Sequence, residues 1–153
     1  MRRTATILAV VALMVVFSSG VALAAYEDSI TGTEHTDFLS GTGKTERIIG
    51  LGGGDRLNGG GGSDLVKGGK GQDELGDGYG TDAVYGGGGA DNLIGQGGDT
   101  SVDGFYGGSG GDIVQSRDVP AVKDTVDCGT GIDTVYADED DVVGGDCERV
   151  NVR

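Results

Sequence analysis

A nine-residue word, G-G-x-G-x-D-x-U-x with U a large aliphatic residue, recurs in eleven variants between Thr31 and Tyr136. The segment Gly59–Lys67 (GGGGSDLVK) is a complete copy. A short repeat in tandem is typical of folds in which each copy is one structural unit that stacks on its neighbours. The repeat therefore constrains the architecture of this chain more strongly than any other feature of its sequence.

Two columns of the repeat carry most of the information. The U column reads Leu39, Ile48, Leu57, Val66, Leu75, Val84, Leu93, Val102, Val114, Val126 and Val135. The last three members, Val114, Val126 and Val135, fall in this column if two three-residue insertions are allowed, at Gly104–Tyr106 and Ser116–Asp118. The acidic column reads Asp37, Glu46, Asp55, Asp64, Asp73, Asp82, Asp91, Thr100, Asp112, Asp124 and Asp133. Its departures from aspartate are Glu46 and Thr100.

Each copy predicts one turn and one short strand. The glycine-rich half takes positive φ without steric cost, and x-U-x is a three-residue strand with U on one face. Two copies make a coil with a turn on each side, and stacked coils pair their strands in parallel and align the U residues as a thin core. The expected fold class is all-β, a flattened parallel β-roll (β-solenoid) over residues 25–136.

The composition suggests that this fold is not stable without a bound ligand. With 34 Gly, no Trp and 5% aromatic residues, the chain lacks an ordinary globular core. Such a composition is typical of disordered proteins, and stacking would bring the acidic residues into like-charge register. A divalent cation between stacked carboxylates would reverse that repulsion, so we expect folding to be coupled to metal binding and disorder to dominate without it.

Calcium is the cation that best suits these donors. Flexible loops that offer carboxylate and carbonyl oxygens favour a large ion with adaptable geometry over Mg²⁺. Zinc is disfavoured because the repeats contain no thiols and the only imidazole is that of His35.

Residues 1–24 have the pattern of a secretory signal peptide. Arg2 and Arg3 precede an apolar run over residues 7–17, and Ala22-Leu23-Ala24 supplies small residues at the cleavage positions. The alternative is a retained membrane anchor, although the apolar run is shorter than the roughly 20 residues that a span needs. We expect a secreted, extracellular protein without membrane insertion after signal removal.

The charge and the cysteines fit an exported protein. Loss of residues 1–24 removes two arginines and no acidic residue, so the net charge falls from −14 to −16. A chain this acidic attracts cations and repels nucleic acid and anionic membranes. Cys128 and Cys147 indicate a disulfide, with metal ligation by two thiols as the alternative. Together with the acidic run Asp138–Asp141 they predict a disulfide-tied C-terminal cap at residues 137–153.

The repeat resembles the hemolysin-type calcium-binding repeat of the RTX (repeats-in-toxin) family. Gly59–Lys67, Gly68–Gly76 (GGKGQDELG) and Gly86–Ile94 (GGGGADNLI) match completely, and Asp77–Tyr85 (DGYGTDAVY) departs only at its first glycine. The likeness extends from about Asp28 to Tyr136. It implies a parallel β-roll in which each Ca²⁺ lies between a turn and the turn two copies later, held by Asp carboxylates and turn carbonyls.

The resemblance implies seven metal ligands: Asp37, Asp55, Asp64, Asp73, Asp82, Asp91 and Asp112. The best pairs are Asp55 with Asp73, Asp73 with Asp91, and Asp64 with Asp82. The pairs Asp37 with Asp55 and Glu46 with Asp64 are weaker, because Thr33, His35, Thr42 and Lys44 replace glycines. Since Thr100 has no carboxylate, Asp99 or Asp103 would have to substitute for it.

These features favour a binding protein over an enzyme. No set of nucleophile, base and orienting residue is recognisable. Related repeats often accompany lytic or proteolytic domains, and we expect no such domain in this sequence. The leading hypothesis is a secreted, non-catalytic calcium-binding protein that folds on binding Ca²⁺. The alternative is a cell-surface or matrix adhesion or structural module that calcium makes rigid, with a cell-surface or glycan partner.

Overall fold

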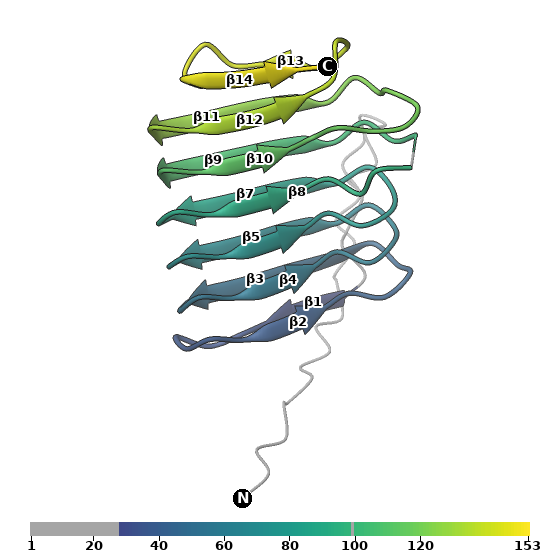
Figure 1. The fold of residues 1–153 in the computed structure, drawn as a ribbon. Coiled ribbons are helices and arrows are strands. Elements are labelled where there is room, and N and C mark those ends of the chain that lie inside the picture. The colour runs from purple at the N-terminus through teal and green to yellow at the C-terminus, as the bar shows by residue number, and fades with distance from the viewer. Residues whose placement is uncertain (1–27, 99) are drawn as a thin grey trace, which may run out of the picture.

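The computed structural model describes residues 28–98 and 100–153, so the predicted signal peptide at residues 1–24 lies outside the described part. These residues form a stack of β-coils (Figure 1). The strands are β1 (Asp28–Thr31), β2 (Phe38–Ser40), β3 (Glu46–Gly52), β4 (Arg56–Asn58), β5 (Leu65–Lys70), β6 (Glu74–Gly76), β7 (Ala83–Gly88), β8 (Asn92–Ile94), β9 (Gly104–Gly110), β10 (Ile113–Gln115), β11 (Thr125–Gly131), β12 (Thr134–Ala137), β13 (Val142–Val143) and β14 (Arg149–Val152). The described ranges contain no helix that is long and apolar enough to span a membrane.

The strands alternate between two seven-stranded sheets. One sheet has the order β1-β3-β5-β7-β9-β11-β13, and the other runs from β2 through the even-numbered strands to β14. Neighbouring strands within each sheet are parallel. Each coil thus gives one strand to each sheet, and the coils rise from the N-terminal end to the C-terminal end (Figure 1). The predicted parallel β-solenoid is confirmed.

The core is the U column. Val66 pairs with Val84 in one sheet and Leu57 pairs with Leu75 in the other, so each aliphatic residue stacks on the equivalent residue one coil away. The buried apolar side chains are Ile48, Leu57, Val66, Leu75, Val84, Leu93, Phe105, Val114, Val126, Cys128, Val135 and Ala137. Two facing rows of side chains fill the space between the sheets, which confirms two copies per coil.

One position of the predicted core was wrong. Val102 is 51% exposed, whereas Phe105 is 0% exposed and pairs with Val84 and Val126. The first insertion therefore precedes Asp103 and does not fall at Gly104–Tyr106. Burial of the large phenylalanine ring removes more apolar surface from water than burial of a valine would, and this favours the observed register.

The strands of the two sheets differ in length. β4, β6, β8 and β10 have the predicted three residues, but β3, β5, β7, β9 and β11 have six or seven, because they continue into the glycines of the next copy. The turns pack directly on one another. At Gly71, with φ of 133°, a Cβ would come within 1.5 Å of the Gly53 carbonyl oxygen. Only glycine fits such a turn position.

The C-terminal segment completes the solenoid. β13 pairs with β11 and β14 pairs with β12, so residues after Ala137 add a last, partial coil to both sheets. The predicted disulfide between Cys128 and Cys147 is present, with a Cα–Cα distance of 5.3 Å. It ties the loop before β14 to a buried position of β11.

Candidate metal centre

The acidic residues form two ladders, one on each side of the solenoid. The first ladder, at the turns that lead into the even-numbered strands, consists of Asp37, Asp55, Asp73, Asp91, Asp112 and Asp133. The second ladder, at the entry to the odd-numbered strands, consists of Glu46, Asp64, Asp82, Asp103, Asp124 and Asp141. Each lies where a turn ends and a strand begins, so the repeat itself places these side chains in line.

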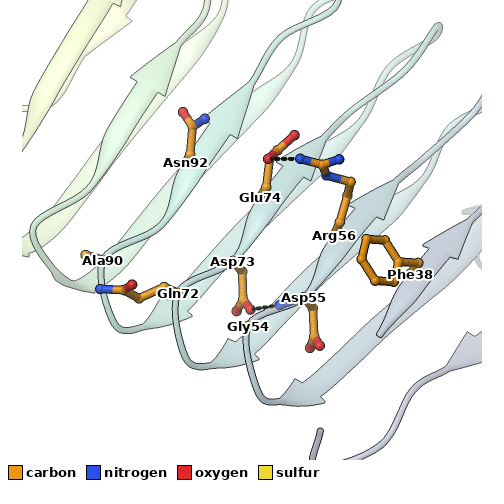
Figure 2. A pocket seen from close by; sticks show the side chains of 9 residues that line it. All are labelled: Phe38, Gly54, Asp55, Arg56, Gln72, Asp73, Glu74, Ala90 and Asn92. Atoms are coloured by element: carbon orange, nitrogen blue, oxygen red, sulfur yellow. Dashed lines mark hydrogen bonds and ion pairs between the residues drawn. The ribbon is translucent and has the colours of Figure 1, made fainter. Parts of the chain in front are cut away.

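Backbone hydrogen bonds hold each ladder together. In the first ladder, Asp55 Oδ1 accepts the Asp37 N–H at 2.8 Å, and Asp73 Oδ1 accepts the Asp55 N–H at 2.8 Å. Figure 2 shows this second bond between successive coils. In the second ladder, Asp64 Oδ1 accepts the Glu46 N–H at 2.7 Å, and Asp82 Oδ1 accepts the Asp64 N–H at 2.6 Å.

The remaining predicted ligands follow the same geometry. Asp91 Oδ1 accepts the Asp73 N–H at 2.9 Å, and Asp112 Oδ1 accepts the Asp91 N–H at 2.8 Å. The structure therefore brings together all five pairs that the sequence predicts. In each pair, one oxygen of the later carboxylate accepts a backbone N–H of the preceding coil.

The second carboxylate oxygen has no such partner in most of these residues. Among the described residues, Oδ2 is buried without a hydrogen bond in eight ladder aspartates: Asp55, Asp64, Asp73, Asp82, Asp91, Asp112, Asp124 and Asp133. These side chains are at most 4% exposed. A buried carboxylate oxygen without a donor costs free energy, so each such atom points to a missing positive partner.

For Asp55, Asp64, Asp73, Asp91 and Asp112, the glycine five places earlier leaves a small space between Oδ2 and a main-chain carbonyl. A Cβ on Gly50 would lie 2.2 Å from Asp55 Oδ2 and 2.6 Å from the Gly68 carbonyl oxygen. A Cβ on Gly68 would likewise lie 2.4 Å from Asp73 Oδ2 and 2.8 Å from the Gly86 carbonyl oxygen. Glycine at this position leaves the two oxygens open to a shared ligand. A set of carboxylate and carbonyl oxygens suits Ca²⁺.

The donor set relies on the main chain. Within the described residues, no three His, Cys, Asp or Glu side chains converge as ligands of one metal ion. A cation at these turns would therefore be held by the ladder carboxylates together with turn carbonyls, and this agrees with the hard, all-oxygen environment expected from the sequence.

The first acid of each ladder is different. Asp37 Oδ2 accepts the Thr33 N–H at 2.6 Å and the Thr33 hydroxyl at 2.9 Å. The Glu46 carboxylate accepts the Thr42 N–H at 2.5 Å and the Thr42 hydroxyl at 2.9 Å. In these two copies threonine replaces the second glycine, and its donors supply the contact that the other turns lack.

Burial changes the acidity of the ladders. Desolvation, the largest cause, raises the pKa of Asp64 and Asp91 to about 6 and that of Asp82 and Asp124 to about 8. The pKa values of Asp73 and Asp112 are also raised, for the same first cause. Neighbouring ladder carboxylates raise these values further, while the backbone N–H donors lower them. A nearby cation would favour the charged form of every group in the ladders.

An outer groove borders the first ladder. It has a volume of about 430 Å³ and is lined by Phe38, Gly54, Asp55, Arg56, Gln72, Asp73, Glu74, Ala90 and Asn92 (Figure 2). The Arg56 guanidinium and the Glu74 carboxylate form an exposed ion pair at 2.6 Å along it. The groove is polar, and the pair links neighbouring strands β4 and β6 on the outer face.

The seven predicted ligands leave out part of both ladders. Asp103, one of the two residues expected to substitute for Thr100, takes its place, because its Oδ1 accepts the Asp82 N–H at 2.7 Å. Its spacing of nine residues before Asp112 was the signal in the sequence. Asp124 and Asp133 were not among the seven predicted ligands, yet both have the unpartnered Oδ2 atom.

Comparisons of the chain with models of protein families, with curated proteins and with solved structures found no significant match. The likeness to RTX repeats consists of the repeat sequence and a solenoid architecture consistent with a β-roll.

Proposed function

We propose that this chain is a secreted, non-catalytic calcium-binding protein whose solenoid becomes stable when Ca²⁺ binds between its turns. The observation that carries this proposal is the row of buried Oδ2 atoms in both ladders. In Asp55, Asp64, Asp73, Asp91 and Asp112 this oxygen lies beside a carbonyl oxygen of the following coil, in a space that glycine keeps open.

The role of the cation follows from the charges. Stacked carboxylates repel one another when ionised, and their burial makes ionisation costly. Bound Ca²⁺ would supply positive charge to the ladder aspartates and accept the turn carbonyls as further ligands. The unfolded chain has no such preformed arrangement of oxygens, so the free energy of binding contributes to folding.

The proposed location sets the expected affinity. Extracellular calcium modules have dissociation constants of roughly 10⁻⁴ to 10⁻³ M, and flexible glycine turns suit calcium better than the smaller Mg²⁺, which requires near-octahedral geometry. The protein would therefore be unfolded at low calcium and ordered in a medium with millimolar calcium.

The test compares the purified chain without residues 1–24 in Ca²⁺ and in Mg²⁺. We expect a gain of β signal in circular dichroism with calcium, and native mass spectrometry should count the bound ions. The triple variant Asp64→Asn, Asp73→Asn, Asp82→Asn should bind fewer ions, because it removes three ladder charges and retains Oδ1 acceptors.

A matched control removes charge elsewhere. Glu139→Gln with Asp140→Asn neutralises two exposed acids outside the ladders and should leave the ion count unchanged. Unaltered calcium uptake in the triple variant, or no gain of β signal in the unsubstituted protein, would refute the proposal.

A further inference from the structure

The copy that begins at Asp77 departs from the repeat pattern, and the coil that stacks on it is also irregular. Asp77 stands where the word has its first glycine, and the following acid of the second ladder, Asp103, comes 21 residues after Asp82, whereas the preceding step is 18. The two irregularities face each other in neighbouring coils. The sequence pattern alone assigns neither of them a role.

A side chain is normally excluded at this position. One coil earlier, a Cβ on Gly59 would lie 1.8 Å from the Asp77 carbonyl oxygen and 3.0 Å from Asp64 Oδ2. Asp77 nevertheless has a side chain, and it is only 1% exposed. The altered turn of the next coil accommodates it, because the Gln96 N–H donates to Asp77 Oδ1 at 2.8 Å. The Gly78 N–H donates to the same oxygen at 2.5 Å.

Asp77 adds charge to a place that already lacks a positive partner. Asp82 Oδ2 is buried without a hydrogen bond, and the Asp82 side chain is 4% exposed. The acids that interact electrostatically with Asp82 are Asp103, Asp64 and Asp77. At the regular turns, the residue in the Asp77 position is glycine and brings no carboxylate. This turn alone among the complete or nearly complete copies offers two acids, Asp77 and Asp82.

We propose that Asp77 and Asp82 together form the highest-affinity cation site of the solenoid, which fills first as calcium rises. This inference rests on the proposed function. The calcium affinity of an oxygen site increases with the number of charged ligands and with the rigidity of the site. Asp77 supplies the additional charge, and its two backbone donors fix its position.

The decisive variant is Asp77→Asn, which keeps the acceptor oxygen for Gln96 and Gly78 and removes only the charge. Asp140→Asn is the control, since it makes the same chemical change at an exposed residue outside the ladders. Isothermal titration calorimetry at limiting Ca²⁺ measures the tightest binding step. We expect its dissociation constant to rise about tenfold or more in Asp77→Asn and to stay unchanged in Asp140→Asn.

Asp77→Gly provides a second measurement, because it restores the regular word and should show the same weakening. If Asp77→Asn does not reach the circular dichroism spectrum of the unsubstituted protein in saturating calcium, the dissociation constant of Asp77→Gly is the test of this inference. A first binding step as tight as that of Asp140→Asn would overturn this inference and leave the proposed function intact. Absence of calcium binding by the unsubstituted protein would overturn both.

Discussion

At the residue scale, a threonine four places before the acid changes the environment of the carboxylate. Where the residue there is threonine, as at Thr33 before Asp37, its N–H and hydroxyl donate to the carboxylate. Where it is glycine, as at Gly69 before Asp73, it has φ of 117° and Oδ2 of the aspartate is unpartnered. A turn of the same length thus either donates hydrogen bonds to the carboxylate that follows it or leaves one carboxylate oxygen open to a cation.

The finding that Phe105, and not Val102, lies in the core is testable by substitution. Phe105→Ala should lower the free energy of unfolding by about 3 to 5 kcal/mol, because it deletes a buried ring between Val84 and Val126. Val102→Ala should change it by less than about 0.5 kcal/mol, because that side chain is largely exposed. Urea denaturation in saturating calcium measures both. A larger loss in Val102→Ala than in Phe105→Ala would contradict the observed register.

At the element scale, the coils depend on their neighbours. Every internal strand is held by parallel pairing on both sides, whereas β13 and β14 each pair with one strand only. β13 has two residues, and β14 is exposed along its whole length. β13 is joined to β11 by only two paired residues, and the disulfide between Cys128 and Cys147 adds a covalent link between this coil and β11.

Reduction of this disulfide should loosen the last coil selectively. The bond closes a loop with a sequence separation of 19, so its loss should cost about 3 kcal/mol. In hydrogen exchange with saturating calcium, reductant should remove protection from β13 and β14 and leave β5 to β8 protected. In the variant Cys147→Ser, reductant should have no further effect. Equal loss of protection in all strands would show that the bond stabilises the solenoid as a whole.

At the scale of the whole molecule, the two ladders make stability depend on pH in opposite ways with and without calcium. The folded-state pKa values of the ladder carboxyls lie above the ordinary value of 3.8, reaching about 6 for Asp64 and Asp91 and about 8 for Asp82 and Asp124. The metal-free folded state therefore binds more protons than the unfolded chain in this range. Its stability must fall as the pH rises.

We accordingly expect metal-free protein to have the most β structure near pH 4 and to lose it progressively up to about pH 8. Calcium should reverse this trend, because its ligands must be deprotonated. Circular dichroism and thermal melts across this range, in metal-stripped buffer and in millimolar calcium, measure the two trends. A metal-free protein that is more stable at pH 8 than at pH 5 would contradict the ladder electrostatics.

The amino-acid sequence was sufficient to predict how the coils stack. A period of nine with an aliphatic and an acidic column predicted parallel coils of two copies, and the resemblance to RTX repeats implied pairs such as Asp55 with Asp73. The bond between Cys128 and Cys147 was expected separately, from an even pair of cysteines in an exported chain. The prediction of the stacking succeeds because a backbone repeat of constant length converts spacing along the chain directly into register between coils. Wherever the period held, no long-range information was needed.

Where the period breaks, the register between coils follows from packing in the folded chain. Val102 and Phe105 both fit an apolar column, and the choice depends on which side chain fills the space beside Val84 and Val126. That choice also moves Asp103 into the ladder. The burial of Asp77 depends on the Gln96 N–H of the following coil, which the order of residues does not reveal. Residue type alone does not predict which side chain is buried at such positions. Burial there depends on contacts between segments whose spacing no longer follows the repeat.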